Sequence, residues 1–177
     1  MLKAASQEVK MTLVDLALGE KIPDKGKVLI QGQPVAKSAP GIIGWIPEAG
    51  GMISNLKVWE NITLPGWYHR KRQKASTEEK ITRLLNELKV DKQDWERFMA
   101  SPGARLSQYE RKLAGLLRGL LLAPTLLLID EDLFDDIETT QKQIWIDMLE
   151  KFVREVDGRA LLVVATSGTL LPWKMIE

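Results

Sequence analysis

The segment from Leu106 to Glu131 constrains this chain most, because a helical pattern in it runs directly into the pattern of a buried strand. Five leucines that precede the strand pattern fall on one face of a helix: Leu113, Leu116, Leu117, Leu120 and Leu121. Ala123-Pro124 ends that helix, because the residue before a proline avoids helical backbone angles. Residues 125–131 form an apolar run that ends in two carboxylates, which is typical of a buried parallel strand whose C-terminal tip meets a ligand.

This segment, LSQYERKLAGLLRGLLLAPTLLLIDE, resembles the signature helix and the Walker B strand of ATP-binding cassette (ABC) ATPases. In that family an LSGGQ motif opens a helix, and four apolar residues then lead to Asp-Glu; the segment matches this order without a gap. The resemblance implies an α/β fold with a P-loop NTPase-like core, a mostly parallel sheet and an inserted helical subdomain at about residues 56–101. It implies a single domain over residues 1–177 whose N-terminal β-subdomain is missing.

The rest of the chain alternates helical and strand patterns, which also predicts an α/β fold with a largely parallel sheet. The predicted helices cover residues 11–19, 77–88, 91–99 and 137–156, and the predicted strands cover residues 27–31, 42–46 and 160–165. Residues 32–34 are predicted to turn. The missing front end predicts an unpaired sheet edge or a gap beside the strand that ends at Asp130, and another chain is expected to cover such an edge.

Residues 4–12 fall where the resemblance places the phosphate loop, a motif written GxxxxGK[ST]. In such a loop glycines let backbone amides converge on phosphate, a lysine reaches the phosphates, and a hydroxyl holds magnesium. All three expected glycines are replaced, by Ala4, Gln7 and Val9. Met11 carries no hydroxyl, and a β-branched valine resists positive φ. Lys10 is retained and interpreted as a solvated charge, and Lys10 and Thr12 are taken as vestigial nucleotide-binding residues.

The signature segment keeps a serine but loses its glycines. Ser107 stays, while Gly-Gly-Gln becomes Gln108-Tyr109-Glu110. In the family this loop caps a phosphate held by the opposite subunit. The spacing of Ser107 and Glu110 instead favours a helix N-cap with a capping box. Ser107 is therefore a vestigial nucleotide-binding residue in this interpretation, and the tyrosine is expected to obstruct close backbone approach.

The remaining site positions are assigned through the resemblance. Asp130 takes the magnesium-binding position and Glu131 the water-activating position, and both are expected to be vestigial. The Q-loop glutamine, which in the family contacts magnesium and the membrane subunit, lines up with Glu48. The switch histidine lines up with Ser167, so the contact to the γ-phosphate is expected to be lost.

The stretch AGGMISNLKVWENITLP resembles the phospholipid-trafficking (Mce/Mla-type) branch of the family, which implies a lipid transporter. The surrounding region is expected to dock a transporter membrane subunit through five residues, Glu48, Met52, Ile53, Trp59 and Trp67. For the four apolar side chains of this set, ordinary packing within the fold is the alternative.

Composition argues against several classes of protein. The chain has 25 Lys and Arg against 24 Asp and Glu, so no global field attracts nucleic acid and no nucleic-acid partner is expected. It has no cysteine for a thiol metal site, and its one histidine, His69, is interpreted as a surface residue, so no metal site is predicted. No run reaches the roughly 20 apolar residues of a membrane span. The expected location is cytoplasmic, peripheral at the cytoplasmic face of a membrane through partner subunits.

Compared with the motifs of the family that the chain resembles, the ligand-contacting positions have changed while the apolar framework persists. The sequence therefore predicts a pseudo-ATPase that needs no cofactor and serves as a structural or regulatory partner in a transporter. Its partners would be a membrane subunit and either a second copy or an intact ABC ATPase, in a homodimer or a heterodimer. Two alternatives stay open: a residual ATPase that uses ATP and magnesium through Lys10, Thr12, Asp130 and Glu131, and a free-standing regulatory domain.

Overall fold

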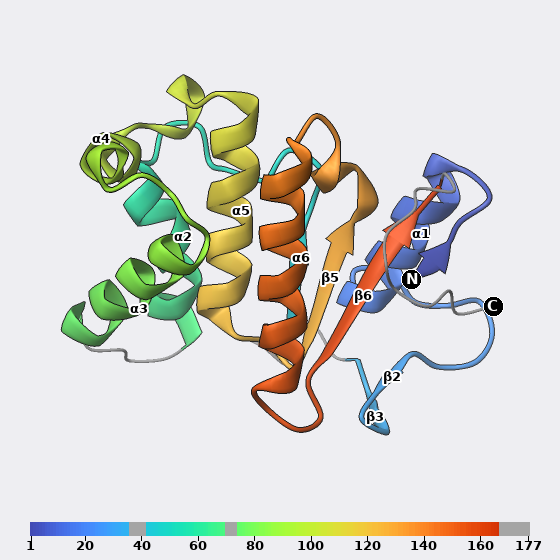
Figure 1. Ribbon diagram of the computed structural model, residues 1–177. Coiled ribbons are helices and arrows are strands. Elements are labelled where there is room, and N and C mark those ends of the chain that lie inside the picture. Colours follow the sequence, from blue (N-terminus) through green and yellow to red (C-terminus); the bar gives the residue numbers. More distant parts are fainter. Residues whose placement is uncertain (36–41, 70–73, 167–177) are drawn as a thin grey trace.

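A computed structural model describes residues 1–35, 42–69 and 74–166 of the chain (Figure 1). Its main sheet has four strands, β1 (Leu2–Lys3), β4 (Ile43–Ile46), β5 (Leu126–Asp130) and β6 (Ala160–Ala165). They lie in the order β1-β6-β5-β4, and every neighbouring pair is parallel. The α/β fold with a parallel sheet, predicted from the alternating pattern, is confirmed.

The predicted gap beside the Asp130 strand is wrong. β5 is paired on both sides, with β4 along Ile43–Ile46 and with β6 up to the pairing of Asp130 with Val164. The returning strand β6 takes the place next to β5, and the short β1 pairs with β6 at Val164 and Ala165. Residues at the start of the chain therefore extend the sheet beyond β6.

A two-residue turn joins the two strands of a small antiparallel hairpin, β2 (Leu29–Ile30) and β3 (Gln33–Pro34). The turn consists of Gln31 and Gly32, which have φ values of 50° and 75°. Positive φ at both central residues is the geometry that matches the twist of a hairpin. The predicted strand at residues 27–31 is thus shorter than expected, and the predicted turn begins one residue earlier, so that residues 33–34 are strand.

Six α-helices and three short 3-10 helices complete the described part of the chain. The α-helices are α1 (Gln7–Leu18), α2 (Val58–His69), α3 (Lys74–Glu87), α4 (Trp95–Ala100), α5 (Gln108–Leu122) and α6 (Thr139–Arg154). The 3-10 helices are η1 (Lys92–Asp94), η2 (Gly103–Arg105) and η3 (Glu131–Phe134). Among the described residues, no helix combines the length and the apolar character that crossing a bilayer requires.

Helices α2, α3 and α4 form an insertion that lies beside α5, on the side away from the sheet (Figure 1). The two ends of this insertion meet. The Val58 N–H donates to the Ser101 carbonyl at 3.0 Å, and Lys57 and Pro102 form an isolated antiparallel bridge.

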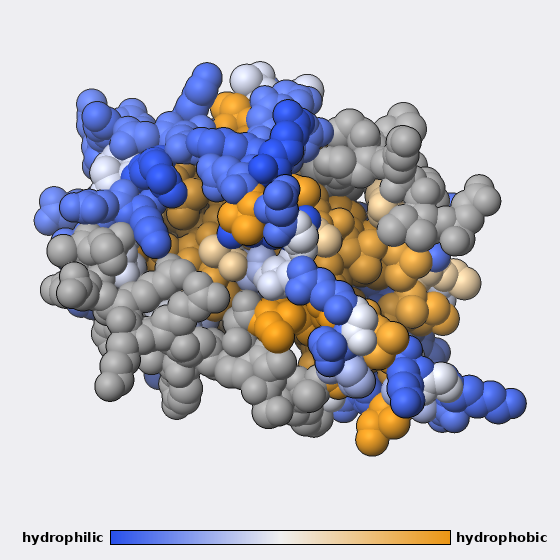
Figure 2. All heavy atoms as spheres, turned by 90° about the horizontal axis from the view of Figure 1, so that it is seen from below, coloured by the Kyte–Doolittle hydropathy of each residue, from blue (hydrophilic) through white to orange (hydrophobic). Residues whose placement is uncertain are grey.

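Hydrophobic residues also reach the surface between hydrophilic ones on the lower face of the molecule (Figure 2).

Helix α5 is the centre of the core. The five leucines predicted to share one face are all buried, and none is more than 6% exposed. The helix ends as predicted before Pro124, with Ala123 in a left-handed conformation at φ 51°. Around α5 the core contains Trp145 and Phe152 of α6 and the buried apolar residues of β5.

The loop after β4 packs directly on the backbone of α5. A Cβ atom built on Gly115 would lie 2.5 Å from the Gly50 Cα atom, so only glycine allows this approach. Gly50 itself has a φ of 74°, which an alanine would adopt only with strain. Arg118, one turn along α5, fixes the loop by donating to the carbonyl oxygens of Gly50 (2.8 Å) and Gly51 (2.5 Å).

We predict that Gly115→Ala lowers the free energy of unfolding by about 1–3 kcal/mol, measured by urea denaturation, because the backbone of Gly50 must move away from the new methyl group. A glycine-to-alanine change inside a helix otherwise stabilises it by about 1 kcal/mol. Gly119→Ala on the same helix is the matched control, since its methyl would meet side-chain atoms of Ile46 and Leu127 and no backbone atom of the Gly50 loop. Equal stability changes in the two variants would contradict the proposed backbone contact.

Candidate functional site

The candidate site lies at the carboxyl ends of the parallel strands, where ligands of open α/β sheets bind. The segment after β1 leads into α1, the segment after β5 forms η3, and β6 ends at Ala165, just before Thr166. The topology therefore brings together the segments that the sequence assigns to the phosphate loop and to the Walker B carboxylates.

The segment after β1 is helical where a phosphate loop would curve. Only residues 4–6 separate β1 from α1, which begins at Gln7. Ser6 is the N-cap, with φ −156° and ψ 167°, and its Oγ accepts from the Val9 N–H at 3.3 Å. Within residues 1–18, all of them described, no residue has a positive φ. An anion-binding nest needs alternating right- and left-handed residues, and this segment supplies none.

Lys10 is completely buried, so its interpretation as a solvated charge is wrong. Its Nζ donates to Asp130 Oδ1 and to Asp132 Oδ2, both at 2.8 Å. The cause is the orientation of α1, whose only buried residues are Lys10 and Val14, one turn apart. Lys10 therefore lies on the face of α1 that packs on the fold, and two carboxylates replace the water that an exposed ammonium would bind.

The electrostatics of this contact favour the charged lysine. Burial disfavours the ammonium, but the hydrogen bonds to Asp130 and Asp132 outweigh it and raise the pKa of Lys10. Burial also raises the pKa of Asp130, while Lys10 and the Asp132 N–H, which donates to Asp130 Oδ1 at 3.1 Å, oppose that rise. The three side chains thus form one ionic cluster, with Lys10 and Asp130 buried and Asp132 partly exposed, that connects α1 to the end of β5.

A second buried lysine holds the same turn from the other side. Lys112 of α5 is 1% exposed, and its Nζ donates to the backbone carbonyls of Asp132 and Asp135, both at 2.8 Å. Neither Lys112 nor Asp132 was identified from the sequence as a site residue. The burial of Lys112 was predictable from its spacing, because it lies four residues before Leu116 and therefore on the buried face of the same helix.

Glu131 points toward the end of β6. It is 1% exposed, and its Oε1 accepts from the backbone N–H of Thr166 and, at 3.3 Å, from the Thr166 hydroxyl. Thr166 was not identified from the sequence. Thr12 lies partly exposed on α1, two residues after Lys10, and Ser167 lies outside the described residues. In the part of the chain that the structure describes, no cluster of three or more His, Asp or Glu side chains is arranged to hold a metal ion.

The signature segment forms the predicted capping box. Ser107 Oγ accepts from the Glu110 N–H at 3.2 Å, and Glu110 Oε2 accepts from the Ser107 N–H at 2.9 Å. Glu110 Oε1 also forms a 2.8 Å ion pair with Arg97 of α4. Burial tends to raise the pKa of Glu110, but its bonds to Ser107 and Arg97 outweigh this effect and lower the pKa. The Tyr109 ring stacks on Trp145 of α6 at a centroid distance of 5.8 Å.

The five predicted docking residues differ in exposure. Glu48 is exposed, and Met52 and Trp59 are partly buried against the core, as the packing alternative expects. Ile53 is 45% exposed. The side chain of Trp67 lies outside the described residues.

Ile53 lines a pocket of about 240 Å³ between β4, α2 and α5. The apolar lining of this pocket, called the β4–α2 pocket below, includes Ile43, Trp45, Ile53, Leu64, Pro65 and Leu122. Asn61, which was not identified from the sequence, fixes the position of Ile53. This buried side chain accepts from the Ile53 N–H at 2.8 Å and donates to the Ile53 carbonyl at 3.0 Å.

Known proteins share this architecture. A dimeric ATP-binding cassette in a post-hydrolysis state, bound to ADP and Pi, superposes with a TM-score of 0.76 at 19% identity, over 94% of this chain and 73% of that chain. The molybdenum import ATP-binding protein ModC of Rhizobium johnstonii is 24% identical over 156 residues, covering 84% of this chain and 41% of the relative. The spermidine/putrescine import ATP-binding protein PotA of Trichormus variabilis is 28% identical over 126 residues, covering 70% of this chain and 32% of the relative. The chain thus spans less than half the length of these two curated relatives.

The sheet order, the helical insertion and the carboxylates at the tip of β5 together define the P-loop type of α/β fold found in ABC ATPases. The chain belongs to the ABC transporter family, whose sequence model matches residues 10–133. The family resemblance of the signature helix and the following strand is therefore confirmed.

We predict that Lys10→Met lowers the free energy of unfolding by about 3–5 kcal/mol, because it leaves Asp130 without its buried counter-charge. Urea denaturation at neutral pH measures this change. Lys21→Met is the matched control, since Lys21 and Asp15 form an exposed pair at 2.9 Å, and such pairs contribute about 0–1 kcal/mol. The buried cluster would be contradicted if the two lysine variants lost similar amounts of stability.

Proposed function

We propose that this chain is a catalytically impaired ABC ATPase-like subunit, a pseudo-ATPase, that serves as a structural or regulatory partner in a transporter complex. The observation that carries the proposal is the buried ion pair of Lys10 with Asp130 and Asp132. In a phosphate loop the lysine reaches the phosphates and the neighbouring hydroxyl binds magnesium. Here the lysine is bound instead to the carboxylate that the family resemblance assigns to magnesium.

The residues present do not fit a magnesium-bound triphosphate. Residues 7–9 are helical, and Ser6 Oγ already accepts from one of the first N–H groups of α1. A helix N-terminus still attracts anions, but the wrapped backbone that distinguishes a phosphate loop is missing from residues 4–9. Glu8 adds a negative charge to the first turn of the same helix. Together these features argue against phosphate binding in the ordinary way.

The signature side of the site supports the same proposal. Ser107 and Glu110 bind each other, and Tyr109 stacks on Trp145. These side chains are used to begin α5 and to pack α5 against α6. In a dimer with an intact ABC ATPase, the chain would offer this capped helix end in place of an LSGGQ motif.

A membrane subunit is the partner that the β4–α2 pocket favours. The pocket has an apolar lining and includes Arg118, and Ile53 at its edge is 45% exposed. An apolar groove of this kind accepts the apolar face of a partner helix. The proposed complex would place the chain in the cytoplasm, peripheral at the membrane, as a homodimer or as a heterodimer with an active ATPase.

The cargo of the proposed transporter is not defined by this site. The two curated relatives are named for the import of molybdenum and of spermidine or putrescine. Lipid transport therefore stays a prediction that rests on the resemblance of residues 49–65 to the Mce/Mla-type branch alone.

We predict that magnesium-ATP at about 1 mM leaves the melting temperature of the chain unchanged. A ligand with a dissociation constant of about 10 µM would stabilise the folded state by about 2.7 kcal/mol at that concentration, which a thermal melt detects easily. The control is the same titration with magnesium alone. A rise in melting temperature with ATP that Lys10→Ala removes would contradict the pseudo-ATPase and support the residual ATPase.

We predict that Ile53→Asp prevents co-purification of a transporter membrane subunit from the native cells, because a charge at this position opposes burial of the β4–α2 pocket. The readout is identification by mass spectrometry of the proteins bound to the tagged chain. Ile22→Asp is the matched control, since Ile22 is 92% exposed and outside the pocket. Failure of the wild-type chain to recover any membrane subunit would contradict the transporter complex.

A further inference from the structure

A second pocket, of about 170 Å³, lies between α3, α5 and α6. Its floor is apolar and includes Leu120, Leu121, Met148 and Phe152. Its rim carries five charged residues, Lys80, Arg83, Glu87, Glu155 and Arg159. We call it the α3–α6 pocket. It shares no lining residue with the β4–α2 pocket or with the cluster around Lys10.

The negative charges of the rim are already neutralised within the fold. Glu87 Oε2 accepts from Lys151 at 2.6 Å, and its Oε1 lies 4.0 Å from Arg83. Glu155 Oε1 lies 3.9 Å from Nζ of the same Lys151. These contacts hold the two carboxylates on the α3 and α6 sides of the pocket.

The positive charges of Lys80 and Arg159 are not matched in this way. Within the described ranges, neither side chain forms a salt bridge with a carboxylate. Arg159 is nevertheless held in place, because its guanidinium carbon lies 4.2 Å from the centre of the Phe152 ring and Nη1 donates to the Phe152 carbonyl at 2.9 Å. A guanidinium fixed by its own fold loses little freedom when it binds an anion.

We propose that the α3–α6 pocket binds a small monocarboxylate with a single-ring body. The carboxylate faces Arg159 and Lys80, and the ring lies on the floor formed by Leu120, Leu121 and Met148. The size follows from the volume, since an apolar cavity of about 150 Å³ accepts benzene. The charge follows from the two unmatched cations, and Met148 offers a favourable sulfur contact to an aromatic ring.

The test is a titration of the whole chain with phenylacetate, followed by NMR of methyl-labelled methionine. We expect the Met148 methyl signal to shift in a saturable manner. Phenylacetamide, which has the same ring without the charge, is expected to bind about tenfold more weakly. Lys80→Gln and Arg159→Gln are each expected to weaken phenylacetate binding by about tenfold, because each removes a charged partner of the carboxylate.

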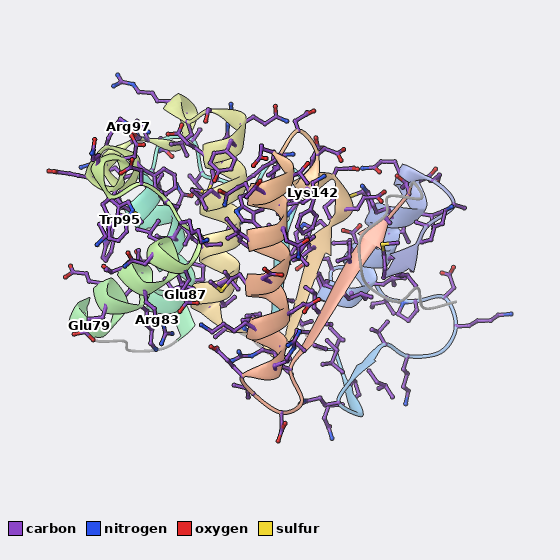
Figure 3. The ribbon with its side chains drawn as sticks, viewed as in Figure 1. Glu79, Arg83, Glu87, Trp95, Arg97 and Lys142 are labelled. Atoms are coloured by element: carbon purple, nitrogen blue, oxygen red, sulfur yellow. The ribbon has the colours of Figure 1, made fainter. Side chains whose placement is uncertain are left out.

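Lys142→Gln is the matched control. Lys142 is in the first turn of α6, and Phe152 is in its last turn. Figure 3 shows Lys142 well apart from Arg83 and Glu87 of α3. The Lys142→Gln variant should leave phenylacetate binding unchanged. Lys80 is exposed, so its variant tests the site even if Arg159→Gln alters the fold around Phe152.

Three results would overturn the proposal: no saturable shift at Met148, equal binding of phenylacetamide, or equal weakening by Lys142→Gln and Lys80→Gln. The proposal does not depend on the pseudo-ATPase. Magnesium-ATP binding would leave it standing, and absence of phenylacetate binding would leave the proposed function standing.

Discussion

The contact between Lys10 and the two aspartates at the end of β5 fixes the position of α1 against the turn η3. It connects the first helix to the central strand, and Lys112 connects the same turn to α5. A buried ion pair contributes little net stability compared with apolar packing, but loss of one partner is costly because it leaves the other charge uncompensated. The position of α1, the turn η3 and the carboxylates of the candidate site are therefore mutually dependent. A change at any one of the three charged residues affects the other two.

The packing of this fold does not depend on the side chains of the candidate site. The core depends on the leucines of α5, on the three-way pairing of β4, β5 and β6, and on the glycine contact between the Gly50 loop and α5. None of these features involves a nucleotide. The cluster around Lys10 supplies from within the chain a cation next to Asp130. The framework can thus be retained for assembly while the site changes, which is the basis of the proposed function.

Much of the fold was predictable because its signals are local. The leucine spacing of α5, the Ala123-Pro124 end and the capping box at Ser107 depend on neighbouring residues, and all three are confirmed. The pairing of β5 was mispredicted because strand order depends on distant segments. Lys10 was mispredicted for a related reason: the sequence shows a lone lysine, and its partners lie 120 and 122 residues away. Thr166 and Asn61 escaped notice because their roles depend on tertiary contacts with Glu131 and Ile53.

The meeting of Val58 with Ser101 at the base of the helical insertion has a further consequence. Main-chain contacts hold the start and the end of the α2–α4 insertion close together. The two points at which the insertion joins the rest of the fold therefore stay close, whatever the length of the chain between them. Lengthening a flexible loop costs free energy only logarithmically once its ends are held close. An insertion of different length could therefore occupy this position, provided that it covers the face of α5 against which α2 and α3 now pack.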